Sequence, residues 1–167
     1  MKKTYYLTIV VALLMVACQQ TPKTVPVDTN AEKAAITALF DKFTSALNVK
    51  DVKTLTTLLT DDALGCGTDP SEFWNKKQLS DTWTQQFADT SFTINWTIDK
   101  REIRVAADSK SAIIVEQYIL PDILSPKITI RNIYLAKKAN ENWMIDFISW
   151  NIVLKNEDIP NLNKAME

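Results

Sequence analysis

The spacing of apolar residues changes near residue 90, and this change constrains the fold more than any other feature of the chain. Before it, apolar residues recur at three- and four-residue intervals, the period of an amphipathic helix. After it, they follow the two-residue period of strands. Helices first and strands afterwards predict an α+β fold in which the two kinds of element are segregated along the chain.

Three helices are predicted in the first half of the chain. The first has a candidate capping box formed by Thr29 and Glu32, the second begins at Asp51, and the third begins near Asn75. Their apolar faces are, in order, Ile36, Leu39, Phe40, Phe43 and Leu47; Val52, Leu55, Leu58 and Leu59; and Leu79, Trp83 and Phe87. These faces are expected to supply one side of the core.

Four strands are predicted in the second half, over residues 91–106, 110–120, 128–138 and 142–154. In the first strand the apolar parity changes between Ile98 and Ile103. That change predicts a bulge near residues 99–101, which would bend the sheet.

The last two strands are apolar on both parities. A two-residue turn at Asn140 and Glu141 would place Ile128, Ile130, Tyr134, Trp143, Ile145 and Phe147 on one face, and Ile133, Leu135, Met144, Ile148, Trp150 and Ile152 on the other. A sheet with one hydrated face would alternate apolar and polar residues. Both faces are therefore expected to be covered, one by the helices and the other by a partner, most simply a second copy of the chain in a homodimer.

The N-terminus has the pattern of an export signal. Lys2 and Lys3 precede an apolar run that is too short for a lasting membrane span and ends in Ala17-Cys18. This resembles a bacterial lipobox and predicts a signal peptide over residues 1–17, with Cys18 carrying the acyl chains, such as palmitate, that anchor the mature chain. An ordinary cleaved signal peptide is the alternative. Residues 18–30 are expected to be a flexible tether, and Gln19 favours the periplasmic face of the outer membrane in the bacterial envelope.

Composition excludes several kinds of function for the remaining domain, residues 31–167. The chain has no histidine and a formal net charge of −1, so it lacks the commonest general base and has no electrostatic reason to bind nucleic acid. Lipidation of Cys18 would leave Cys66 as the single cysteine, which excludes an intramolecular disulfide and a conventional zinc site. No metal or cofactor is expected.

Two segments carry a family resemblance. Leu59-Thr60-Asp61-Asp62-Ala63, which leads into residues 67–74, and Asn142-Trp143-Met144-Ile145 resemble the nuclear transport factor 2-like superfamily, including its SnoaL-like and ketosteroid isomerase-like members. The resemblance covers about residues 31–154 and implies a cone-shaped fold, with three N-terminal helices packed on a curved antiparallel sheet and a short strand at residues 63–67. It also implies a pocket at the open end and dimers formed through the outer sheet face.

The chain departs from the catalytic members of that superfamily. The general-base carboxylate of ketosteroid isomerases would fall near Cys66 or Gly67, and histidines found in related domains are replaced by Phe147 and Ser149. The steroid-isomerase chemistry is therefore not expected here.

Residues 64–74 contain both glycines of the chain and look like an active-site loop. Asp69, Pro70 and Glu72 stand where the N-cap, first and third residues of a short helical turn would stand, which favours capping carboxylates over an acid/base pair. Gly65 and Gly67 share a strand face that a helix or ligand can approach closely. Cys66, between them, is expected to be a small buried apolar residue.

Other candidates lie in the strands. Arg131 and Asp146 share a face if the predicted turn forms, an arrangement that resembles the epoxide hydrolases of this superfamily, although a surface or interface ion pair is the favoured interpretation. Tyr118 completes the candidate catalytic set with Asp69, Glu72 and Asp146. The candidate pocket residues are Phe40, Phe43, Trp74, Trp83, Trp96, Tyr118, Tyr134 and Trp150.

Three functions stay open at this point. The leading one is a lipoprotein that binds a small apolar ligand, or acts as an accessory protein, without catalysis. The second is an isomerase, hydratase or hydrolase that uses pocket carboxylates. The third is a module that assembles with another envelope protein through its sheet.

Overall fold

The computed structural model describes residues 28–91, 95–119 and 129–166. The predicted signal peptide, Cys18 and nearly all of the tether lie outside these residues, as does Ile128. Within the described part of the chain, no helix is long and apolar enough to cross a membrane.

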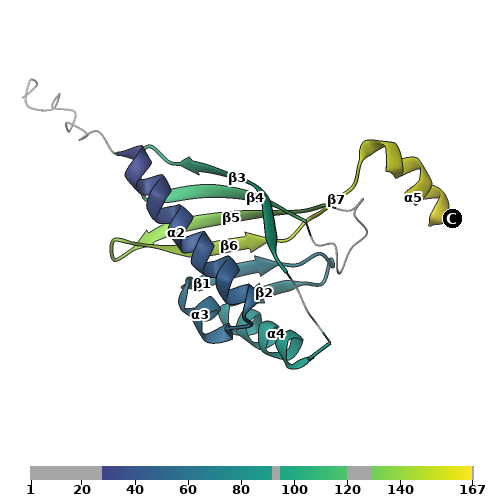
Figure 1. Cartoon of the computed structure of the whole chain (residues 1–167), viewed down its shortest axis with the longest axis horizontal. Coiled ribbons are helices and arrows are strands. Elements are labelled where there is room, and N and C mark those ends of the chain that lie inside the picture. The colour runs from purple at the N-terminus through teal and green to yellow at the C-terminus, as the bar shows by residue number, and fades with distance from the viewer. Residues whose placement is uncertain (1–27, 92–94, 120–128, 167) are drawn as a thin grey trace, which may run out of the picture.

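The fold is α+β, as predicted, with helices followed by a curved, unclosed sheet (Figure 1). The helices are α2 (Thr29–Asn48), α3 (Val52–Thr57), α4 (Lys76–Ala88) and α5 (Ile159–Ala165), with the 3-10 turn η1 at Asn156–Asp158. The strands are β1 (Leu59–Cys66), β2 (Phe73–Asn75), β3 (Thr97–Val105), β4 (Ser111–Ile119), β5 (Thr129–Ala139), β6 (Asn142–Ser149) and β7 (Ile152–Val153).

The described strands form one sheet in the order β2-β1-β6-β5-β4-β3, with β7 paired to β5. Neighbouring strands are antiparallel except β1 and β6, which are parallel. Figure 1 shows α2 running across the sheet, with α3 and α4 beside β1 and β2, while α5 projects beyond β7. The short strand predicted at residues 63–67 is therefore the second half of the longer β1.

The predicted helices are present, but one of the predicted caps is wrong. Asp51 caps α3, and Asn75 forms a capping box with Gln78 at the start of α4. At α2 the cap is Asp28, whose side chain accepts from two backbone N–H groups, rather than Thr29.

Glu32 is turned toward the sheet instead of the helix terminus. It accepts hydrogen bonds from Lys138 Nζ at 2.5 Å and Trp143 Nε1 at 2.8 Å. These two partners lower the pKa of Glu32, the hydrogen bond from Lys138 having the larger effect. Glu32 therefore ties the first turn of α2 to β5 and β6.

The bulge predicted in the first strand is confirmed, because the β3–β4 register shifts between Ile98 and Lys100. That strand begins at Thr97, so Ser91, Asn95 and Trp96 lie outside it. The turn at Asn140 and Glu141 is also confirmed, with both residues at positive φ. These are the two devices that shape the long strands.

A second bulge, not predicted, changes the assignment of sheet faces. Leu135 pairs with Phe147 while Ala136 pairs with Ile145, so Asp146 is the extra residue. Beyond it the parity reverses, so Ile148, rather than the predicted Phe147, shares the buried face with Tyr134 and Ile145, and Phe147 is partly exposed. The predicted last strand is also divided, into β6 and β7.

The sheet faces differ in burial. The inner face packs against the helices around Phe40, Phe43, Ile114, Tyr134 and Ile148, all fully buried. On the outer face, Ile113 and Ile133 are 51% and 42% exposed. The two-sided apolar pattern of the sequence therefore corresponds to one covered and one uncovered face.

Candidate functional site

Three polar residues form a row across the inner face of the sheet. Arg101 on β3 pairs with Glu116 on β4, and Glu116 pairs with Asn132 on β5. Glu116 is fully buried, Asn132 is 1% exposed, and the side chain of Arg101 is 13% exposed. We call Arg101, Glu116 and Asn132 the polar row.

The polar row separates two apolar regions of the interior. On one side, Ile114 and Tyr134 belong to the main core. On the other, Tyr118 and Ile130 form a smaller cluster, with Trp96 and Ile98 packed against it. We call these four residues the end cluster.

Trp96 closes the end cluster on the helical side. Its ring packs edge-on against Tyr118, with 5.0 Å between ring centroids, and it also touches the main core. The Asn48 side chain at the end of α2 accepts from the backbone N–H of Trp96 at 2.9 Å. Asn48 Nδ2 also donates to the Trp96 carbonyl at 3.5 Å, so one side chain of α2 bonds both backbone groups of the residue before β3.

Arg101 lies between two carboxylates. Its Nε donates to Glu116 Oε1 at 2.5 Å, and its Nη1 donates to Asp41 Oδ1 on α2 at 2.6 Å. Burial opposes the charge of Arg101, but the hydrogen bond to Asp41 and the charge of Glu116 outweigh it and raise the pKa of the guanidinium. Because Asp41 is largely exposed, this ion-pair network runs from the surface to the buried Glu116.

Glu116 is the buried carboxyl of the site. Its second oxygen, Oε2, accepts from the hydroxyl of Tyr118. Burial raises the pKa of Glu116, and the charge and hydrogen bond of Arg101 oppose that rise. A buried carboxyl beside a cation and a tyrosine is the kind of group from which binding and acid–base sites are built.

Two tyrosines and an amide continue the network along the sheet. The hydroxyls of Tyr118 and Tyr134 lie 3.0 Å apart, and Asn132 Nδ2 donates to the Tyr134 hydroxyl at 3.0 Å. Burial, with the charge of Glu116 second, raises the pKa of Tyr134 well above its ordinary value. Tyr134 therefore remains a neutral hydroxyl at physiological pH.

The network is not complete within the described part of the chain. Arg101 Nη2, Asn132 Oδ1 and Trp96 Nε1 are buried there without a hydrogen-bond partner, as are Thr44 Oγ1 and Ser109 Oγ outside the network. A buried polar atom without a hydrogen-bond partner lowers the stability of the fold, so such atoms are rare in protein interiors. Of the first three atoms, two belong to the polar row and the third to the end cluster.

The corner at residues 64–74 is satisfied by its own residues. Asp69 Oδ1 accepts from the backbone N–H of Ser71 at 2.8 Å, and Glu72 Oε2 accepts from the backbone N–H of Asp69 at 3.0 Å. Both carboxylates therefore bond backbone N–H groups, as favoured, but no helix begins here, and the chain turns from β1 into β2. The predicted turn is present as a single turn, closed by the hydrogen bond from the Glu72 N–H to the Asp69 carbonyl, and it does not continue into a helix, since α4 begins only at Lys76. Hydrogen bonds from Ser71 lower the pKa of Asp69.

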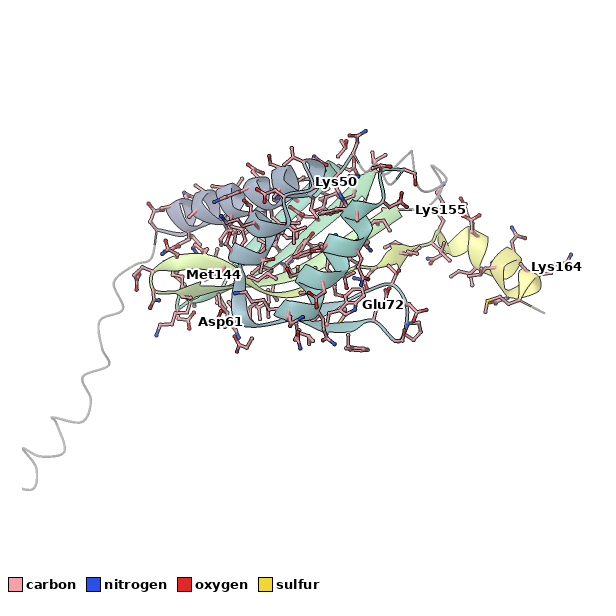
Figure 2. The ribbon with its side chains drawn as sticks, turned by 90° about the horizontal axis from the view of Figure 1, so that it is seen from below. Lys50, Asp61, Glu72, Met144, Lys155 and Lys164 are labelled. Carbon is pink, nitrogen blue, oxygen red and sulfur yellow. The ribbon has the colours of Figure 1, made fainter. Side chains whose placement is uncertain are left out.

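Both glycines of the corner are approached closely by other residues. A Cβ on Gly65 would lie 2.6 Å from Leu79 Cδ2 of α4, and one on Gly67 would overlap the Glu72 side chain. Cys66 between them has a free, partly exposed thiol rather than the predicted buried one. Figure 2 shows Glu72 at the loop between β1 and β2, on the periphery of the domain.

Arg131 and Asp146 take different partners. Arg131 donates to Gln117 Oε1 at 3.0 Å, whereas Asp146 pairs with Lys137 at 2.7 Å and accepts from Thr60 at 3.0 Å. The bulge at Asp146 altered the register on which their pairing was predicted. Tyr118 is the one candidate catalytic residue that lies in the polar network.

The eight candidate pocket aromatics divide into three groups. Phe40, Phe43, Trp83 and Tyr134 pack edge-to-face in the main core. Trp74 and Trp150 pack on each other, 6.2 Å apart, near the β1–β2 corner. Trp96 and Tyr118 border the polar row.

Sequence reasoning missed Arg101, Glu116 and Asn132, although the strand pattern contained a signal for them. Glu116 has the same parity as Ile114 and Tyr118, and Asn132 has the same parity as Ile130 and Tyr134. A polar residue in phase with buried ones on both neighbouring strands indicates a buried polar site. In the described ranges no group of carboxylate or cysteine side chains is arranged to hold a metal ion.

Comparison with known proteins identifies the class of this fold. A nuclear transport factor 2-like protein from Cytophaga hutchinsonii is 17% identical, with a TM-score of 0.60 over 72% of this chain and 98% of its own. A nuclear transport factor 2-like protein of unknown function from Pseudomonas putida is 14% identical, with a TM-score of 0.66 over 78% and 92% of the two chains. A Nostoc punctiforme domain of unknown function with a cystatin-like fold is 20% identical, with a TM-score of 0.65 over 81% and 86%. At these identities the likeness is one of fold.

The family model of the SnoaL-like domain matches residues 36–146, and the chain belongs to that family. No functionally curated protein matches the sequence. The match spans nearly all of the solved Cytophaga and Pseudomonas chains.

Proposed function

We propose that this protein is a membrane-anchored binding protein whose SnoaL-like domain holds a small, mainly apolar molecule between the end cluster and the polar row. The observation that carries the proposal is that three unpartnered buried atoms, Arg101 Nη2, Asn132 Oδ1 and Trp96 Nε1, belong to the polar row and the adjoining end cluster. Binding sites for small molecules combine apolar walls with a few convergent polar groups. The end cluster supplies such walls beside the row.

Naphthalene, a rigid apolar probe, tests this proposal. The full chain in lipid nanodiscs is expected to retain naphthalene in equilibrium dialysis above the level of empty discs. Trp96→Ala should weaken binding because it removes one wall, whereas Phe73→Ala, which truncates an aromatic ring that is 64% exposed, should not. Equal retention by protein-loaded and empty discs would contradict the proposed function.

A second candidate function is acid–base catalysis with Glu116 in place of the carboxylates suggested by sequence. The raised pKa of this buried carboxyl favours it, since such groups are enriched at catalytic sites. Glu116 could exchange a proton with a bound molecule only through Tyr118, because Arg101 and Tyr118 occupy its two oxygens. Conversion of a bound molecule, abolished by Glu116→Gln, would favour this function over simple binding.

The proposed location is the periplasmic face of the bacterial outer membrane, with Cys18 as the lipid-bearing residue. The support is the order of basic residues, apolar run, Ala17 and Cys18 in the sequence. Cys18→Ser should move the protein from the membrane to the soluble fraction. Unchanged fractionation would contradict lipid anchoring.

The proposed assembly is a homodimer through the outer face of the sheet. Ile113, Ile133 and Ile119 are 51%, 42% and 51% exposed on neighbouring strands, and large contiguous apolar patches are uncommon on monomers. Sedimentation of the domain from residue 28 onward should give a dimer at micromolar concentration, and Ile133→Lys should give a monomer. A wild-type monomer would favour another envelope protein on this face.

A further inference from the structure

The hydrogen bonds from Glu116 to Asn132 have a defined direction. Glu116 accepts at both oxygens, from Arg101 Nε at Oε1 and from the Tyr118 hydroxyl at Oε2. A carboxylate with a donor at each oxygen is satisfied in its ionised form. The Tyr118 proton therefore points at Glu116, and the Tyr118 oxygen is left to accept.

The same direction continues to the next strand. With the Tyr118 proton already used, the Tyr134 proton points toward the Tyr118 oxygen, 3.0 Å away, or toward Glu116, with which Tyr134 also shares a hydrogen bond. The Tyr134 oxygen then accepts from Asn132 Nδ2. Tyr134 keeps the proton that this arrangement needs, because burial raises its pKa.

The donor-to-acceptor direction of these hydrogen bonds decides which end of the Asn132 amide has no partner. An asparagine amide can be turned over in a structure unless its neighbours distinguish nitrogen from oxygen. Here they do, since Tyr134 can only accept from it. The unpartnered atom of Asn132 is accordingly the acceptor Oδ1, at a residue that is 1% exposed.

We propose that the polar row selects a neutral ligand that carries a hydroxyl group, with the hydroxyl donating to Asn132 Oδ1, and that Glu116 sets this selectivity through Tyr118 and Tyr134. The inference rests on the proposed binding function and adds the chemistry of the ligand's polar end. The hydroxyl also has lone pairs for Arg101 Nη2 or Trp96 Nε1, which lack partners in the described part of the chain. A charged group would be disfavoured, because Glu116 and Arg101 already neutralise each other in the buried site.

The Glu116→Gln substitution makes a specific test of this direction. The glutamine oxygen must face the donor Arg101, so its nitrogen faces Tyr118 and donates to it. Tyr118 then donates to Tyr134, Tyr134 donates to the Asn132 oxygen, and the amide turns over. The free atom becomes Nδ2, a donor, so the site should prefer a ligand that only accepts.

Two probes with the same ring system measure the preference. They are 1-naphthol, which can donate, and 1-acetylnaphthalene, which can only accept. Equilibrium dialysis would use the full chain in lipid nanodiscs, with empty discs as the blank. The wild type is expected to bind 1-naphthol at least about fivefold more tightly, since the ketone leaves a buried acceptor unpaired. Glu116→Gln should reverse the order, and Asn132→Leu should abolish the preference.

The outcomes separate this inference from the proposed function. If the wild type binds both probes equally, or Glu116→Gln keeps the hydroxyl preference, the proposed direction of the hydrogen bonds from Glu116 to Asn132 is wrong, while binding of an apolar molecule stands. If neither probe is retained above empty discs, the binding function fails and the inference fails with it. Should Glu116→Gln not fold, as judged by circular dichroism, Tyr134→Phe replaces it. That variant removes the hydroxyl that distinguishes the two ends of the Asn132 amide, so the amide can present either end and the preference should disappear. An unchanged preference would overturn the inference.

Discussion

The β1–β2 corner and the polar row are both groups of polar residues on one sheet, yet their chemistry is organised in opposite ways. In the corner, Asp69 and Glu72 bond groups two and three residues away. In the row, Arg101 reaches Glu116 and Asp41, which are fifteen and sixty residues away. The corner is exposed and satisfied, whereas the row is buried and leaves atoms without partners in the described residues.

The difference shows that local density of chemically active residues is a poor guide to a site in this chain. Aspartate, serine and glutamate close together in sequence can satisfy one another as a turn. A buried polar group depends on the fold to bring its partners from other helices and strands. A missing partner there therefore indicates a ligand more strongly than a cluster of polar residues at an exposed turn does. The four predictions below test this contrast.

The largest effect is expected from breaking the buried ion pair. Arg101→Leu leaves the fully buried Glu116 without its counter-charge and should lower the free energy of unfolding by about 3–5 kcal/mol, measured by urea denaturation. The double variant Arg101→Leu/Glu116→Leu should recover much of that loss. No recovery would show that the destabilisation comes from lost packing rather than from the isolated charge.

The next effect lies in the corner and is steric. Gly65→Ala places a methyl group 2.6 Å from Leu79 Cδ2, so overpacking should lower the free energy of unfolding by about 1–3 kcal/mol. Adding Leu79→Ala should make the Gly65→Ala substitution nearly neutral. If Gly65→Ala is harmless in the wild-type background, α4 is free to move away from β1.

A smaller effect is expected at the corner carboxylate. Asp69→Ala removes the acceptor for the Ser71 N–H and hydroxyl and should lower the thermal midpoint by less than Gly65→Ala does. Asp69→Asn keeps an acceptor and should leave the midpoint nearly unchanged. A large drop for the asparagine variant would mean that the charge itself has a buried partner.

The smallest effect expected is in the pH dependence of stability, which should have opposite signs for Glu116 and Asp69. The pKa of Glu116 is raised from 4.5, so its contribution to stability is present below that value and lost as pH rises through the folded-state pKa. The wild type should therefore gain stability relative to Glu116→Gln as pH falls from 7 toward 4.5. The pKa of Asp69 is lowered from 3.8, so the wild type should lose stability relative to Asp69→Asn as pH falls below 3.8. Urea denaturation at a series of pH values would measure both slopes, which are expected to have opposite signs. Slopes of the same sign would contradict the contrast.

The helices, the first bulge and the β5–β6 turn could be predicted from the sequence, because each depends on residues that are neighbours in the chain. Periodicity predicted the helices, a parity change predicted the bulge after Ile98, and Asn140-Glu141 predicted the turn between β5 and β6. The bulge at Asp146 was not readable, since β6 is apolar on both parities and a reversal of phase leaves no trace. That bulge is why Ile148, rather than Phe147, entered the core.

The site was readable only in part. A tight turn at residues 107–109 brings Arg101 opposite Glu116, because each residue further from the turn on β3 meets one equally far from it on β4. β4 ends at Ile119 and β5 begins at Thr129, a separation too long in sequence to predict the register that places Asn132 beside Glu116. Whether Asn132 Oδ1 and Trp96 Nε1 have hydrogen-bond partners depends on how several helices and strands pack together, so their lack of partners could be found only in the structure.

Because the polar row divides the interior, the domain has two regions that can open separately. The end cluster has few buried apolar residues, and a single side chain, Asn48, bonds the backbone of Trp96 to α2. Regions of this kind unfold locally at lower free energy than the core they adjoin. Amide hydrogens near Ile98 and Tyr118 are therefore expected to exchange with solvent faster than that of Ile114. Under the proposed binding function, transient fraying of β3 and β4 would be the route of the ligand, while Phe40, Ile114 and Tyr134 remain packed.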